Sequence, residues 1–186
     1  MSRAGDGLPV NPTEYKRLVG NLLYATATRP DLMYVVCLLS RYMENPTRQH
    51  MLAAKRVIRY LKGTLSMGVW YKRRNEETKL LGYTNSNYAG DVDDWKSTSG
   101  YTFFLVGGVV SWASKKQLVV TFSTTEVEFV VTSFCAAQCV WMRRVLEQIG
   151  WKKSVAGATK MMCDNSSAIK LTKNPVLYGR SKHIDI

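Results

Sequence analysis

The sequence predicts an α/β (α+β) domain in which helices pack against one sheet, preceded by a small helical segment. Residues up to about 66 have apolar residues at helical spacing, whereas residues 67–186 begin with short segments rich in β-branched and aromatic residues. A long helical pattern, another strand and a short helix then follow. We therefore expect a flexible N-terminus over residues 1–11, a helical segment over 12–66 and the sheet-containing domain over 67–186.

Three helices are predicted in the helical segment. A proline opens the patterns at 12–27 and 30–43, and the third pattern, at 48–61, stops at Gly63. In the third pattern the apolar face consists of Ala54, Val57, Ile58 and Leu61. About a quarter turn away lies a basic stripe that consists of Arg48, Lys55, Arg59 and Lys62. This stripe is either a contact for a nucleic-acid backbone or an ordinary solvated helix face.

The second portion changes to strand-like patterns. The expected strands are 68–73, 79–84, 99–106 and 109–114, and the last two are joined by Gly107-Gly108, a dipeptide typical of hairpins. A long helix is expected from near Ser123 to about Ile149, followed by a strand at 159–164 and a short helix at 165–172. The apolar stripe of the long helix is predicted to consist of Val127, Val131, Phe134, Gln138, Trp141 and Val145.

Composition and charge exclude several classes of protein. The 26 Lys and Arg against 14 Asp and Glu give a net charge of +12, which makes a polyanion the expected partner. With 46% hydrophobic residues the chain is not a disordered basic tail. The four cysteines and two histidines lack the spacing of a zinc site, so we expect buried thiols. Because the sequence shows no apolar leader and no long apolar run, we expect an intracellular protein, cytoplasmic or nuclear.

Three carboxylates stand where strand ends and helix starts would bring them together. Glu128 lies in the first turns of the long helix, Asp164 ends a strand and Asp185 is next to last in the chain. Hard cations such as Mg²⁺ prefer oxygen ligands, and phosphoryl transfer often uses a pair of these ions. Purely structural roles remain open as well, because Asp164 also fits a helix N-cap and Glu128 an exposed helix glutamate. Glu126 is explained by a capping box that begins at Ser123.

Longer motifs occur in a fixed order: LGYTNSNYAGDVDDWKSTSGYTFFLVGGVVSWASKKQ, FSTTEVEF, QCVWMRRVLEQIG, CDNSSAIKL and KNPVLYGRSKHIDI. Together they resemble the RNase H domain of Ty1/copia-type retrotransposon Pol polyproteins. Residues 12–64 are similar to the segment that in those polyproteins follows the reverse transcriptase palm. The resemblance implies a five-stranded mixed sheet with flanking helices, and Mg²⁺-dependent cleavage of the RNA strand of RNA/DNA hybrids.

In that family four carboxylates carry the activity and hold the metal. The resemblance places the second, third and fourth at Glu128, Asp164 and Asp185. The first belongs to a motif that usually reads YSDADWAGD, and here residues 83–91 read YTNSNYAGD. Asn85 therefore stands where the first Asp belongs, and Asn87 replaces the second Asp of the motif.

An amide at the first position has a chemical consequence. It offers a metal one neutral oxygen and an NH₂ group in place of a second anionic oxygen. We therefore expect weak or single-ion Mg²⁺ occupancy and a rate that is lower by several orders of magnitude. Asp91, Asp93 and Asp94 are not expected to compensate, because the family has acids there beside the catalytic Asp.

Two further departures concern the C-terminal motif and the surfaces near it. Tyr178 stands where the family often has His, and the sequence stops at Ile186, before the helix that follows in the family. We therefore expect Asp185 to be mobile, and the face that this helix would cover to be open to a protein partner or to self-association. Phosphate contacts with a hybrid are expected from Lys115, Lys116, Gln117, Arg180 and Lys182.

Three functional hypotheses follow. The first is a copia-type RNase H-like remnant, catalytically impaired, that still binds nucleic acid weakly. The second is a co-opted protein-interaction or effector-like module without nuclease activity, although the sequence shows neither a signal peptide nor an Arg-x-Leu-Arg motif. The third is an active ribonuclease H that works with Asn85.

Overall fold

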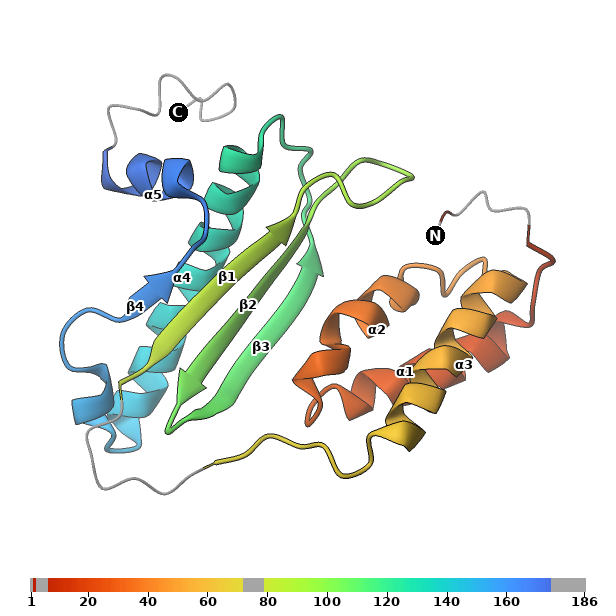
Figure 1. The fold of residues 1–186 in the computed structure, drawn as a ribbon, viewed down its shortest axis with the longest axis horizontal. Helices are drawn as coiled ribbons and strands as arrows, with labels where there is room; N and C mark the ends of the chain where they lie inside the picture. Colours follow the sequence, from red (N-terminus) through yellow and green to blue (C-terminus); the bar gives the residue numbers. More distant parts are fainter. Residues whose placement is uncertain (1, 3–6, 72–78, 175–186) are drawn as a thin grey trace. The chain divides into compact units, whose positions relative to one another are not determined.

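The computed structural model describes residues 2, 7–71 and 79–174, and the chain divides into two compact units, Met1–Val69 and Trp70–Ile186. The first unit is helical, and the second contains a mixed sheet with helices packed on it (Figure 1). The predicted fold class is therefore confirmed. Predictions for residues 72–78 and 175–186, including those for Tyr178, Arg180, Lys182 and Asp185, lie outside the described residues.

The helical unit consists of α1 (Pro12–Ala25), the 3₁₀ turn η1 (Pro30–Leu32), α2 (Met33–Ser40) and α3 (Arg48–Gly63). Asn11 caps α1 by accepting a hydrogen bond from the Thr13 N–H at 2.9 Å. The predicted helix at 30–43 is thus split and shorter. After Ser40 the chain tightens into i→i−3 bonds, in which the N–H groups of Arg41 and Tyr42 donate to carbonyls three residues earlier.

The three helices of this unit share one apolar core, and polar side chains fix how they pack. The core consists of Tyr15, Val19, Leu22, Leu32, Val36, Leu39, Tyr42, Met51, Ala54 and Val57. His50 is buried at the start of α3, accepts a hydrogen bond from the Thr47 N–H at 3.0 Å and stacks on Tyr42. Ile58, predicted on the apolar face of this helix, is instead 41% exposed.

Arg29 ties the end of α3 to the turn before η1. Its guanidinium makes a two-point ion pair with Asp31, at 2.9 and 2.7 Å. It also donates to the main-chain oxygen and the hydroxyl of Thr64, at 3.1 and 2.8 Å. The side chain of Arg29 is buried, so this cation serves the fold of the helical unit.

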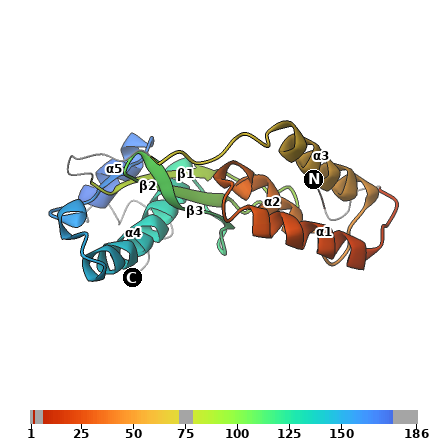
Figure 2. The ribbon, with the colours of Figure 1, turned by 90° about the horizontal axis from the view of Figure 1, so that it is seen from below.

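The second unit has a four-stranded sheet in the order β3-β2-β1-β4. Its elements are β1 (Leu81–Asn87), β2 (Thr98–Leu105), β3 (Gly108–Lys116), α4 (Thr124–Gln148), the 3₁₀ turn η2 (Lys152–Val155), β4 (Lys160–Met162) and α5 (Ser166–Lys173). β1, β2 and β3 are antiparallel neighbours, and β4 runs parallel to β1. The long helix α4 lies along one face of the sheet (Figure 2).

The predicted strand at 68–73 does not form over its described part, residues 68–71. Tyr71 instead packs by its side chain, and its hydroxyl donates to the main-chain oxygen of Val109 at 2.6 Å. A Cβ on Gly108 would lie 2.5 Å from the Tyr71 ring, so only glycine leaves room for this contact. The described residues thus contain four of the five strands that the resemblance implies.

The buried stripe of α4 is shifted by one residue from the predicted one after Val131. It consists of Val127, Val131, Cys135, Cys139, Met142 and Leu146, and Trp141 is 59% exposed. Helical spacing fits both neighbouring stripes equally well, and the side of the helix that meets the sheet is set by packing against residues such as Phe103. The small thiol side chains of this stripe lie inside the core.

The prediction of buried thiols holds for two of the four cysteines. Cys135 and Cys139 are buried, and burial raises the pKa of the Cys135 thiol to about 12. Cys37 and Cys163 are only half-buried. Cys163 therefore remains accessible to groups outside the core.

Among the helices of the described residues, α4 is long and apolar enough to span a membrane, judged by length and composition alone. The core helix of a folded domain passes the same test. In this structure α4 buries its apolar stripe against the sheet, which is the role of such a core helix.

The turn between β2 and β3 is shifted from the predicted Gly107-Gly108 dipeptide. Leu105 pairs with Gly108, so Val106 and Gly107 form the two-residue loop, with φ of 54° and 76°. Positive φ at both positions is the geometry of a type I′ turn, which favours Asn-Gly. Val106 therefore has a β-branched side chain where the backbone disfavours one.

Replacing Val106 with Asn is expected to raise the free energy of unfolding by about 1 kcal/mol, because Asn tolerates the left-handed backbone conformation. Urea unfolding followed by circular dichroism measures this change. Val119→Asn is the control, since Val119 is 54% exposed and has no positive φ. A less stable Val106→Asn variant would contradict this account of the turn.

Candidate functional site

A cavity of about 290 Å³ lies where the end of β1 meets the first turns of α4 and the start of α5. The residues that line it are Asn85, Ser86, Tyr88, Thr124, Val127, Glu128, Asp164 and Asn165. Three positions that the resemblance implies, Asn85, Glu128 and Asp164, thus lie around one cavity although they are far apart in the sequence. The fourth, Asp185, is outside the described residues.

Glu128 is the buried carboxylate of this cavity, with 5% of its surface exposed. Its Oε1 accepts a hydrogen bond from the Ser86 N–H at 2.9 Å, and the Cys163 Sγ lies 3.8 Å from its Oε2. Burial raises the pKa of the Glu128 carboxyl, the charge of Asp164 acts in the same direction, and the Ser86 hydrogen bond offsets part of this effect. The alternative of an exposed helix glutamate is therefore excluded.

Asp164 is exposed and does not cap α5. The cap is Asn165, whose Oδ1 accepts a hydrogen bond from the Ala168 N–H at 2.9 Å. Asp164 is thus left facing Glu128, and one ligand atom from each of Glu128, Cys163 and Asp164 lies within 4.8 Å of the others. Sequence reasoning missed Cys163, whose only signal was its place directly before Asp164 in the CDNSS motif.

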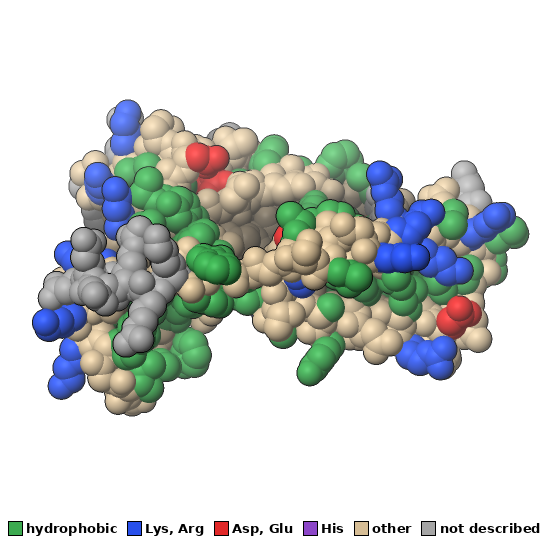
Figure 3. Space-filling model, turned by 60° about the horizontal axis from the view of Figure 1, so that its bottom comes forward, with side chains coloured by type: hydrophobic (Ala, Val, Ile, Leu, Met, Phe, Trp, Pro, Cys, Tyr) green, Lys and Arg blue, Asp and Glu red, His purple; other side chains and the backbone are tan. Residues whose placement is uncertain are grey.

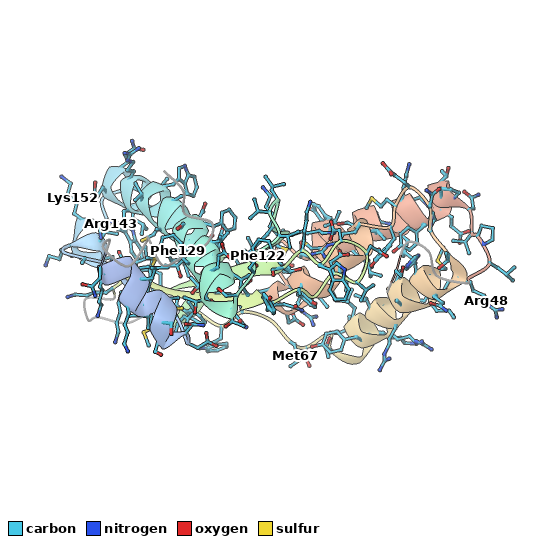
Figure 4. The ribbon with its side chains drawn as sticks, turned by 90° about the horizontal axis from the view of Figure 1, so that it is seen from above. Arg48, Met67, Phe122, Phe129, Arg143 and Lys152 are labelled. Carbon is cyan, nitrogen blue, oxygen red and sulfur yellow. The ribbon has the colours of Figure 1, made fainter. Side chains whose placement is uncertain are left out.

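The start of α4 is fixed by a capping arrangement that resembles the predicted box. Ser123 Oγ accepts a hydrogen bond from the Glu126 N–H at 3.2 Å. The Glu126 carboxylate accepts from the Phe122 N–H at 2.7 Å, one residue earlier than in the usual box. Figure 4 shows Phe122 at this end of α4. Glu126 therefore helps to cap the N-terminus of α4.

Gln117 is buried, although the sequence places it among the phosphate contacts. Its Nε2 donates to Ser99 Oγ at 2.8 Å, and its second proton is shared between the Val127 main-chain oxygen at 3.3 Å and Ser86 Oγ at 3.4 Å. These bonds join the end of β3 to β1, β2 and α4. Gln117 therefore holds α4 in position beside Glu128 and does not present its amide to solvent.

Lys116 also forms ion pairs within the protein. Its Nζ lies 2.6 Å from Asp91 Oδ2 and 2.8 Å from Asp94 Oδ1. Asp91 is buried and also accepts a hydrogen bond from the Asp93 N–H at 3.0 Å, so it organises the loop between β1 and β2. Three phosphate contacts are predicted at the end of β3: Lys115, Lys116 and Gln117. Of these described residues, Lys115 is exposed.

The donor types around the cavity limit which cations it can hold. Mg²⁺ takes six oxygen ligands and is commonly bound through one or two carboxylates and several waters. The described residues offer the carboxylates of Glu128 and Asp164, the amide of Asn85 and the thiol of Cys163. The two carboxylates and the amide oxygen of this set fit one Mg²⁺ completed by waters, whereas the soft sulfur of Cys163 does not suit this ion.

Comparison with known proteins identifies relatives of this chain. No family model and no solved structure matches the chain. The retrovirus-related Pol polyprotein from transposon TNT 1-94 of Nicotiana tabacum is 39% identical over 173 residues, which are 92% of this chain and 13% of that relative. The Pol polyprotein from transposon RE2 of Arabidopsis thaliana is 42% identical over 181 residues, 97% of this chain and 12% of the relative.

The chain covers most of the length of a shorter relative. Secreted RxLR effector protein 161 of Plasmopara viticola is 43% identical over 129 residues, which are 69% of this chain and 90% of that protein. The chain spans only 12 to 13% of the length of the two transposon polyproteins. Similarity of this strength along almost all of its residues shows that the chain belongs to the family of retrovirus-related Pol polyproteins of Ty1/copia-type transposons.

Proposed function

We propose that this transposon-derived chain is an RNase H-like domain with its preceding helical segment, and that Asn85 impairs its divalent-cation site. The observation that carries the proposal is the shared cavity of Asn85, Glu128 and Asp164. The ancestral activity is cleavage of the RNA strand of RNA/DNA hybrids. The chain in its present form is proposed to bind such a hybrid weakly and to cleave it poorly.

The residues of the cavity have separable tasks on this proposal. Glu128 and Asp164 would hold a single Mg²⁺, which when bound neutralises charge on a phosphate and lowers the pKa of a water. Ser86 fixes one oxygen of Glu128 through its N–H, so the buried carboxylate has a defined orientation. Asn85 supplies a neutral oxygen where a second anion would bind the cation more strongly.

A protein-interaction role is the second candidate. Two observations favour it: the chain covers 90% of a relative named as a secreted effector, and apolar side chains are exposed between β3 and α4. Leu118 is 84% exposed, and Phe122, two residues before the cavity residue Thr124 in the sequence, is 63% exposed. This surface would bind a protein partner or a second copy without any cleavage.

Restoring the carboxylate with Asn85→Asp is expected to raise Mg²⁺-dependent cleavage of an end-labelled RNA/DNA hybrid by at least about a hundredfold. Asn87→Asp is the matched control. It makes the same change two residues away on β1, where the Asn87 side chain lies against Gly90. Only Asn85→Asp should gain activity, and Glu128→Gln in that background should remove the gain.

Two results would contradict the proposal for Asn85. Equal cleavage by the unmodified chain and by Asn85→Asp would show that the amide does not limit the reaction. If neither the unmodified chain nor Asn85→Asp cleaves the hybrid while their circular dichroism is unchanged, the RNase H-like site is not intact. This result would favour the interaction role.

Glu128→Gln is expected to stabilise the chain at pH 7. The pKa of Glu128 is raised in the folded state, so the folded state binds this proton more tightly than the unfolded state does. Stability therefore falls as the pH rises from the unfolded value of about 4.3 through the folded pKa. Glutamine removes this loss and can still accept the Ser86 hydrogen bond.

Urea unfolding at pH 7 and near pH 4 measures this difference. The advantage of Glu128→Gln should be present at pH 7 and disappear at the lower pH. Glu147→Gln is the control, because Glu147 is an exposed glutamate on the same helix. A Glu128→Gln variant that is less stable than the unmodified chain at pH 7 would contradict the stated cost of burying this carboxylate.

A further inference from the structure

α3 carries five basic side chains and no Asp or Glu. The basic face of α3 is defined here by Arg48, Lys55, Arg56, Arg59 and Lys62, which are all exposed. Figure 3 shows Lys and Arg side chains gathered over the helical unit, and Figure 4 shows Arg48 at the start of α3, directed outward. A helix face with one sign of charge creates a local positive potential that opposite charges on the same helix would otherwise reduce.

Four of these residues follow the helix repeat. Arg48, Lys55, Arg59 and Lys62 are separated by seven, four and three residues, which keeps them on one side of a helix with about 3.6 residues per turn. At about 1.5 Å per residue this row is about 21 Å long. Phosphates of one nucleic-acid strand rise about 3.4 Å each along the duplex axis, so the row can face several of them at once.

This arrangement works against the stability of α3 itself. Lys55 and Arg59 are four residues apart and Arg59 and Lys62 three, and like charges at these spacings repel. Arg48 stands in the first turn, where the helix dipole also disfavours a cation. Arg29 of the same unit shows the opposite pattern, because Asp31 pairs with it. The basic face is thus not explained by the needs of the fold.

The other face of α3 indicates which polyanion fits. Met51, Ala54 and Val57 are buried in the core of the helical unit, so the main apolar face of α3 is not available to insert into a bilayer. Leu52, Ile58 and Tyr60 of α3 are exposed, but at helical spacing they do not form one continuous apolar stripe. The accessible side of α3 also carries the row of long cationic side chains. Such a row suits a regular array of phosphates at the surface of a duplex.

We propose that the basic face of α3 binds the phosphate backbone of a nucleic-acid duplex, without base specificity. The helical unit then holds nucleic acid by a surface of its own. This inference goes beyond the proposed function, because it needs neither the cavity of the second unit nor a bound cation.

The test uses the full chain and a labelled DNA duplex of about 20 base pairs, titrated between about 50 and 200 mM salt. The variant Lys55→Gln/Arg59→Gln removes two charges from the basic face. The variant Arg144→Gln/Lys152→Gln removes two exposed charges from α4 and η2 of the second unit, so the two variants have the same net charge. Urea unfolding of each variant at low salt accompanies the binding measurement.

The α3 variant is expected to bind at least about tenfold more weakly and to lower the slope of log K against log salt by about 2, whereas the matched variant changes affinity less than about twofold. The same α3 variant should unfold at a higher urea concentration in low salt, because two repelling charges are gone. Weaker binding together with higher stability cannot result from misfolding.

Three results would overturn the inference. Equal losses in both variants would show that net charge alone matters, and no loss in the α3 variant would show a solvated face without a partner. Binding to vesicles that contain phosphatidylserine, lost in the α3 variant while duplex binding is unchanged, would assign the face to a membrane surface. The cleavage assay with Asn85→Asp is unaffected by any of these results, so this inference and the proposed function can fail separately.

Discussion

The hydrogen bonds of the buried Gln117 amide are the constraint on which the rest of the candidate site depends. This side chain at the end of β3 donates to Ser99 of β2 and to the main chain of Val127 in α4. The first turns of α4 are thereby fixed against the sheet, and Glu128, the next residue, accepts its hydrogen bond from Ser86 of β1. These hydrogen bonds give a buried carboxylate one position instead of several.

On our proposal, the cavity combines an ordered frame with a reduced set of metal ligands. Keeping Glu128 buried costs stability, and proteins commonly retain such perturbed carboxyls at functional sites. Asp164 is free to act beside it because Asn165 takes the capping role. The loop that carries Asp91 is held by its own ion pair with Lys116. On our proposal, the frame of a cation site is present here and the change lies in the chemistry of one ligand position, Asn85.

The positive charge of the chain serves two physical purposes. Arg29 and Lys116 are paired with carboxylates and hold loops in place, so they contribute to the fold. The cations of α3 have no acidic residue on their own helix and lie on its exposed side. A paired cation and its carboxylate cancel in the formal net charge, so the excess of +12 comes from cations without a matching acid. The cations of α3 are of this kind, and they are available to a polyanion.

The sequence by itself determined the features that depend on neighbours along the chain. It predicted the helix starts at Pro12 and Ser123 and the mixed α/β class, because caps and periodicity are local. Tertiary structure decided the burial of Gln117, the proximity of Cys163 to Glu128, and which of two equally spaced stripes of α4 faces the sheet. These depend on contacts between segments distant in sequence, and helical spacing alone does not say which neighbour a side chain will meet.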